Sequence, residues 1–203
     1  MTPAAPVPRP RAPLDAVRRW YERELGWPAA GGTAGEPVQL LTGVRFDVLE
    51  LPPDAGFAVL RRVARTGPVA YDPAAGAVRL LVAAGSADEL PGLLDWLEWG
   101  GIALDLTALG AGGRIAAPTP DAVAGSREAV RVGSRETVWV RPPEPGCEVE
   151  PTLPVTGLGG GGGAPDLVRL VGAAATECHR ARLLRASRAR SGRPSGVQPL
   201  AFS

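Results

Sequence analysis

Glycine and proline are so frequent in this chain that it must contain many loops. There are 27 glycines and 22 prolines in 203 residues, gathered at both ends and between apolar segments. Both residues destabilise the interior of a helix or strand. The hydrophobic fraction of 45% is still enough to bury a core. We therefore expect one domain with many loops and loosely ordered ends.

Helical and extended segments alternate along the middle of the chain. Apolar residues recur at helical spacing in residues 14–25, 54–64, 86–97 and 166–189. Shorter apolar runs predict strands at residues 38–41, 44–51, 69–71, 78–83, 102–106, 114–117 and 137–140. Ser86 and Glu89 form an S-x-x-E capping box that predicts the start of the third helix. This order favours an α/β (α+β) fold in which helices flank a mixed β-sheet.

The same pattern predicts the domain boundaries. Residues 14–143 form the α/β domain between a disordered tail, 1–13, and a Pro/Gly-rich linker, 144–165. An arginine-rich C-terminal helix, 166–190, and a disordered tail, 191–203, follow. The apolar stripe of this helix predicts that it docks on the domain. Its members are Leu167, Leu170, Ala174, Cys178, Ala181 and Leu184.

A glycine motif in the linker invites a cofactor interpretation. Gly157, Gly159 and Gly162 have the spacing of a dinucleotide fingerprint. That motif works only where a strand leads into the glycines, and residues 151–154, Pro-Thr-Leu-Pro, are no strand. The linker interpretation is therefore favoured, and no cofactor is expected from this segment.

The composition points to a cytoplasmic protein without membrane contact. The N-terminal residues lack the apolar run of a signal peptide, and no segment approaches the ~20 apolar residues that span a bilayer. Cys147 and Cys178 are too few for a disulfide scaffold. All 22 basic residues are arginine, which is typical of GC-rich coding. Because the net charge is only +1, binding to a polyanion would need a local basic patch.

One such patch is present in the last helix. Its arginines are Arg180, Arg182, Arg185, Arg188, Arg190 and, beyond it, Arg193, with no acid among them. They are either a solvated helix end, favoured by the helix dipole, or a contact surface for nucleic-acid phosphates or an acidic partner.

The roles of the tryptophan, cysteine and histidine side chains are less clear from the sequence pattern. Trp96 and Trp99 lie three apart on a predicted helix, where they either pack in the core or form a protein-contact face. Cys178 is expected in the core and His179, the only histidine, at the surface. Without a second histidine no Ser-His-Asp or Cys-His arrangement stands out.

Three carboxylates lie in predicted strands. They are Asp47, Glu50 and Asp105. Two-metal phosphoryl chemistry needs two or three carboxylates that converge on one face. Strand side chains alternate, so Asp47 shares a face with Leu49 and not with Glu50. The pair is out of phase for binding one metal cluster.

The order of these segments resembles the N-terminal domain of bifunctional DNA primase/polymerases, the prim-pol branch of archaeo-eukaryotic primases, from high-GC bacteria. The matching segments are residues 26–28 (Gly-Trp-Pro), 44–50, 77–81, 101–105, 112–118 and the strand around Trp139. The resemblance implies that Asp47 and Asp105 are metal positions, holding Mg²⁺ or Mn²⁺ if the protein is active. It adds Arg79 and Arg114 to Arg180, Arg182, Arg185 and Arg188 as candidates for nucleic-acid binding.

The same resemblance implies a loss of catalysis. The family's second carboxylate falls at Leu49, and its histidine falls near Val78 or Arg79. We therefore expect a degenerate module that binds nucleic acid or protein and needs no cofactor. The alternatives are an active primase/polymerase using Asp47, Glu50 and Asp105, and a structural scaffold that docks through Trp96 and Trp99.

Overall fold

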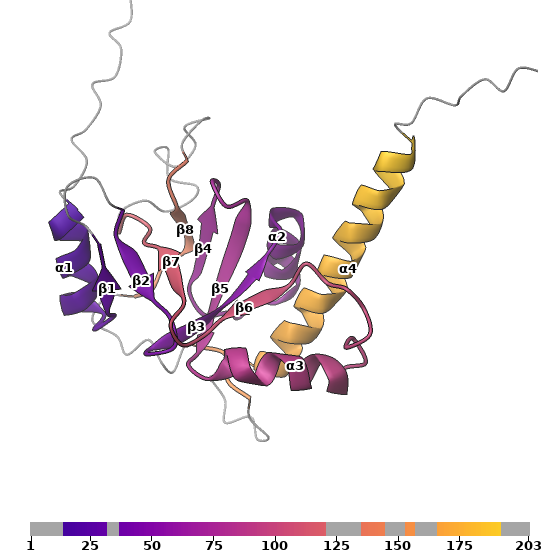
Figure 1. Cartoon of the computed structure of the whole chain (residues 1–203), viewed down its shortest axis with the longest axis horizontal. Coiled ribbons are helices and arrows are strands. Elements are labelled where there is room, and N and C mark those ends of the chain that lie inside the picture. Colours follow the sequence, from indigo (N-terminus) through magenta and orange to yellow (C-terminus); the bar gives the residue numbers. More distant parts are fainter. Residues whose placement is uncertain (1–13, 32–36, 121–134, 145–152, 157–165, 192–203) are drawn as a thin grey trace, which may run out of the picture.

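The structure is a computed structural model that describes residues 14–31, 37–120, 135–144, 153–156 and 166–191. Its helices are α1 (Leu14–Glu24), α2 (Pro53–Arg62), α3 (Ser86–Trp96) and α4 (Leu167–Ser191). Its strands are β1 (Ala29–Ala30), β2 (Gln39–Leu41), β3 (Phe46–Leu51), β4 (Val69–Asp72), β5 (Ala77–Ala83), β6 (Thr107–Leu109), β7 (Arg114–Ala116) and β8 (Val138–Arg141). The predicted α+β class, with helices flanking a sheet and a C-terminal helix, is confirmed (Figure 1).

The main sheet has five strands in the order β6-β3-β5-β4-β8, and every neighbouring pair is antiparallel. The sheet therefore differs from the mixed one expected, although β3 and β4 run parallel on either side of β5. For β4 and β5 the cause is the tight turn that joins them, because strands joined by such a turn pair antiparallel. Asp72 closes that turn by accepting the N–H groups of Ala74 and Ala75, both at 3.0 Å.

A second sheet, β1-β2-β7, continues from the first through a sharp corner. β2 leads directly into β3, and β6 leads directly into β7. Since β2 pairs with β7 and β3 pairs with β6, these four strands form one bent two-stranded ribbon that crosses from one sheet to the other. At the corner Thr42 Oγ1 donates to the carbonyl of Gly110 at 2.6 Å. Gly43 has a φ of 84°, and a Cβ there would meet the backbone of Ala111. The corner therefore requires glycine at this position.

The two faces of the main sheet bury different cores. On one face Leu49, Leu80 and other β3 and β5 side chains pack against α2, α3 and α4. The opposite face is covered by α1 and the small sheet, and its large aromatic side chains are Tyr21, Trp27, Phe46 and Trp139. Trp139 Nε1 donates to the Tyr21 hydroxyl at 3.1 Å, which in turn donates to the carbonyl of Pro118 at 2.8 Å.

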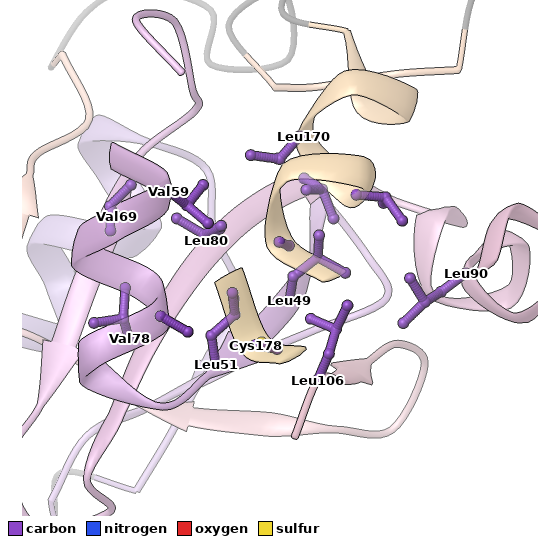
Figure 2. Packing of buried hydrophobic residues seen from close by; sticks show 14 of the residues in the cluster. Leu49, Leu51, Val59, Val69, Val78, Leu80, Leu90, Leu106, Leu170 and Cys178 are labelled. Atoms are coloured by element: carbon purple, nitrogen blue, oxygen red, sulfur yellow. The ribbon is translucent and has the colours of Figure 1, made fainter. Parts of the chain in front are cut away.

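Helix α4 is part of the first core, not an appendage. Leu170 and Cys178 lie over Leu49 and Leu51 of β3 (Figure 2). The predicted docking stripe is confirmed from Leu167 to Ala181, since its members in this range are all buried. The prediction is wrong at Leu184, because half of its surface is exposed where α4 extends past the domain.

The structure describes part of the predicted linker. Its residues 145–152 and 157–165 lie outside the described part of the chain, and so does the glycine motif. Between them Leu153 is buried in the second core, and the carbonyl of Pro154 accepts the N–H of Ala83 at 3.1 Å. Val155 then forms a parallel bridge with Asp166. These few residues tie the segment before α4 to the edge of the domain.

Two local predictions were wrong. The strand expected at residues 102–106 begins later, at Thr107, because residues 97–106 form the connection that passes α4. The capping box does not form, since Gly85 with a φ of 92° is the N-cap of α3 and Ser86 is already helical. No helix in the described ranges is long and apolar enough to cross a membrane.

Candidate functional site

Asp47 is a buried anchor for α3. Its side chain is on the same face of β3 as Leu49, as strand alternation predicted. Oδ2 accepts the backbone N–H of Ala87 at 2.9 Å. A carboxylate at this place satisfies one of the free N–H groups of the helix start and lies at the positive end of its dipole. Its Oδ1 is also buried and has no hydrogen-bond partner among the described residues.

Asp105 lies in a different environment, on the surface beside α4. Its carboxylate pairs with Arg185 Nη2. Arg185 Nη1 also contacts both carboxylate oxygens of Asp54, at 3.0 and 2.9 Å. The guanidinium therefore joins the start of α2 to the segment entering β6. Sequence reasoning missed Asp54 as a partner because nothing local links it to a residue 131 positions away.

Asp47 and Asp105 are held by different partners, one buried at the start of α3 and the other exposed beside α4. The register of β3 on β6 pairs Val48 with Leu109, which places Gly110 opposite Asp47. Asp105 lies before the first residue of β6, at a bend, where it pairs with Arg185. Paired catalytic metals lie ~3.5–4 Å apart. No group of three or more metal-ligating side chains occurs in the described part of the chain. These residues therefore do not fit the divalent ion that the resemblance implies.

Glu50 belongs to an ion-pair cluster on the opposite face of the sheet. It pairs with Arg79, its cross-strand neighbour, through Nε at 2.9 Å. Arg79 Nη1 also donates to Asp72 Oδ2 at 2.7 Å. Side-chain exposure is 9% for Arg79 and for Asp72, against 30% for Glu50. Arg79 is consequently held inside the protein, and its expected role in nucleic-acid binding is not supported.

The remaining arginine candidates divide into two groups. Arg182 donates to the carbonyl of Ala103, and Arg185 forms the pairs described above, so both fasten α4 to the domain. Arg188 is exposed and forms no ion pair with another described residue, and Arg114 is exposed on β7. Arg180 belongs with the exposed group, as described next.

Glu177 is nearly buried, and its principal partner is on α2. Arg62 Nη1 lies 3.0 Å from Glu177 Oε1. Arg180, whose side chain is 57% exposed, approaches the same oxygen only to 3.9 Å. Neither contact has the geometry of a hydrogen bond, so the interaction of this oxygen with the two arginines is electrostatic only. Two arginines therefore share one carboxylate, and an excess of positive charge remains at this side of α4.

Exposed arginines gather in the C-terminal half of α4. Arg180, Leu184 and Arg188 follow one another every four residues, and Leu183, Ser187 and Arg190 form the adjoining row. We call these six residues the outer face of α4. All six are exposed: Leu183, Ser187 and Arg190 point away from the docked Ala181, whereas Leu184 and Arg188 are exposed because α4 extends past the domain. The helix carries six arginines and one glutamate, a net charge of +5 in a chain whose total is +1.

The two tryptophans of the scaffold hypothesis have different surroundings. Trp96 is 71% exposed at the end of α3. Trp99 is half-buried, and its ring lies 5.8 Å from that of His179 on α4. His179 is therefore not the free surface residue expected, because it helps to pack the end of α3 against α4. Its Nδ1 is buried and has no hydrogen-bond partner among the described residues.

Cys178 is fully buried, as predicted. Removal from water, followed by the nearby Asp105 carboxylate, raises the pKa of its thiol to about 12. The thiol is accordingly neutral and unreactive in the folded state. Burial likewise raises the pKa of Tyr21 far above its ordinary value.

The three predicted catalytic residues therefore have separate structural roles: Asp47 caps α3, and Glu50 and Asp105 each pair with a different arginine. The exposed arginines of α4 form a cationic surface. Comparison of the chain with protein-family models, with curated proteins and with solved structures found no match.

Proposed function

We propose that this chain is a catalytically degenerate prim-pol-like module that binds nucleic acid in the cytoplasm through the outer face of α4. The observation that carries the proposal is the excess of exposed arginine on a helix that extends beyond the domain (Figure 1). Guanidinium groups bind phosphates through paired hydrogen bonds. Such contacts are independent of base sequence, so the binding is expected to be non-specific.

The different contacts of the arginines along α4 support this role. Arg182 and Arg185 are bound to the domain, and they hold the helix in place. Arg188 lies one turn beyond Leu184 and continues the exposed row that begins at Arg180. Clustered cations that lack nearby acids repel one another, and a polyanion relieves that repulsion. The fixed inner arginines and the exposed outer ones therefore have different expected effects when mutated.

The same structure argues against the primase/polymerase alternative. Asp47 is buried as a helix anchor, and Glu50 and Asp105 are each paired with an arginine. Primer extension with Mn²⁺ or Mg²⁺ tests this directly. Nucleotide incorporation that disappears in Asp47→Ala and in Asp105→Ala would establish an enzyme and refute the degenerate assignment.

The binding test is fluorescence anisotropy with a labelled single-stranded DNA across a range of salt concentrations. Each phosphate contact contributes about −0.7 to the slope of log K against log salt on single strands. The variant Arg180→Gln/Arg188→Gln/Arg190→Gln should weaken binding and flatten that slope by about 2.

A matched control removes three charges elsewhere. Arg18, Arg19 and Arg23 lie on α1, on the far side of the molecule from α4 (Figure 1). Changing all three to glutamine should leave the slope as it is. Equal loss in both triple variants would show a general charge effect, and the assignment to α4 would then be wrong.

The scaffold hypothesis keeps one supporting observation, the exposure of Trp96. In that case a protein partner docks at the end of α3 and DNA binding is absent. Trp96→Ala would then abolish capture of the partner while leaving the unfolding midpoint unchanged.

A further inference from the structure

An open groove of about 460 Å³ runs between α3 and β6, apart from the outer face of α4. Its lining residues come mostly from α3 and from the segment of β6, and α3 passes beneath β6 in Figure 1. Its lining is mostly apolar and comes from Leu90, Pro91, Leu94, Leu106 and Ala108. The groove is therefore an apolar concavity of the size that accommodates a few side chains.

One wall of the groove is the backbone edge of a strand. β6 is the outermost strand of the main sheet and pairs with β3 alone among the described strands. Leu106, Thr107 and Ala108 all line the groove, although successive side chains point to opposite faces. The groove must then follow the edge of β6, where unpaired N–H and C=O groups can pair with another strand.

The facing wall supplies a further acceptor. Pro91 lies inside α3 and has no N–H group. The carbonyl of Ala87, four residues earlier, therefore lacks the helical donor that it would otherwise have. Ala87 and Pro91 both line the groove.

The acidic residue Asp95 lines the groove, and Asp88 lies beside the lining residues of α3. Asp88 and Asp95 lie two turns apart on the exposed side of α3, with Pro91 between them. Neither carboxylate forms an ion pair with another residue that the structure describes. α3 itself contains no basic residue. An occupant with positive charge would meet two uncompensated carboxylates.

We infer that the groove binds an extended peptide segment of alternating apolar and basic residues, which adds a strand to the edge of β6. The apolar side chains enter the groove against Leu90 and Leu94, and the basic ones reach Asp88 and Asp95. Backbone bonds to β6 give affinity in this mode of recognition, and the alternate side chains give specificity. The partner is thus a protein segment, distinct from the nucleic acid proposed for α4.

The probe is a fluorescent heptapeptide, Arg-Val-Arg-Val-Arg-Val-Arg, titrated with the full chain and followed by anisotropy. Saturable binding is expected. The variant Asp88→Asn/Asp95→Asn should weaken it at least about fivefold, because both carboxylate charges are gone while the groove keeps its shape. Asp15→Asn/Glu24→Gln on α1 removes the same charge at exposed positions and should leave binding unchanged.

A second arm tests the strand addition itself. The same peptide with alternate amides N-methylated keeps its side chains but loses the backbone donors, so binding should disappear. With the unmodified peptide, amide hydrogen exchange should slow at Thr107–Leu109 and not at β8, the opposite edge of the sheet. The α4 triple variant should bind the peptide normally, which separates this site from the nucleic-acid surface. Absence of saturable binding, or binding indifferent to both N-methylation and the Asp88→Asn/Asp95→Asn variant, would overturn the inference.

Discussion

Replacing Arg79 with methionine should destabilise the protein strongly without changing nucleic-acid binding. Arg79 is the shared partner of Glu50 and Asp72 on β5, at 2.9 and 2.7 Å. Methionine fills a similar volume but leaves the Asp72 carboxylate buried without its cation. Removing one partner of a buried ion pair typically costs about 3–5 kcal/mol. Glu50 is more exposed, so most of this cost falls on Asp72.

The measurement is urea unfolding followed by tryptophan fluorescence, since Trp27 and Trp139 are fully buried. For a chain of this size a loss of 3–5 kcal/mol corresponds to a fall in Tm of roughly 6–20 °C. A second substitution, Asp72→Asn, removes the orphaned charge and keeps the amide oxygen that accepts the turn N–H groups. The double variant should therefore recover about half or more of the loss.

Arg18 is the matched control. It pairs with Glu22 at 2.8 Å on the exposed face of α1. Arg18→Met should leave the unfolding midpoint nearly unchanged, because an exposed pair is screened by solvent. A cost below about 1 kcal/mol for Arg79→Met, or no recovery in the double variant, would refute the reasoning that a buried charge dominates.

Further outcomes follow from other buried groups. In a Cys147→Ser background the Cys178 thiol should resist alkylation at pH 8 until the protein unfolds, as a mass shift in urea would reveal. The folded state raises the pKa of that thiol to about 12 from an ordinary 9.0, so the free energy of unfolding should fall between about pH 9 and pH 12, by up to about 1.4 kcal/mol per pH unit. Gly56→Ala should cost about 1–3 kcal/mol in urea unfolding, because the new methyl would lie 2.4 Å from Cβ of Val78. Asp47→Ala should lower stability by about 1–2 kcal/mol, and Asp47→Asn by less, since the amide oxygen can still accept at the start of α3.

The sequence predicted those features that depend on geometry within one element. Strand alternation placed Asp47 with Leu49 on one face and Glu50 on the other, and the structure confirms this. Helical spacing likewise identified the buried stripe of α4 as far as Ala181. It failed at Leu184, because periodicity cannot show where the domain beneath a helix ends.

Features that depend on distant segments were not predictable. The capping box at Ser86 was displaced because Asp47, from a strand 40 residues away, occupies the helix start. Arg185 was assigned to an external phosphate, yet its partners Asp54 and Asp105 come from α2 and the segment leading into β6. A run of like charges indicates that groups of opposite charge should lie nearby. It does not show whether these groups belong to the same chain or to a partner. The prediction that Arg79 binds nucleic acid was not supported for the same reason. Only the register of β3 on β5 places its acidic partner Glu50 opposite it.

The burial of α4 against β3 has a consequence for biosynthesis. Leu49 and Leu51 are made more than a hundred residues before their contacts Leu170 and Cys178. During synthesis, the part of this apolar sheet face that α2 and α3 do not cover therefore stays exposed until α4 has emerged. That half of the molecule cannot complete its folding before α4 has been made, and a nascent chain stalled before residue 166 should bind chaperones that it no longer binds once α4 has docked.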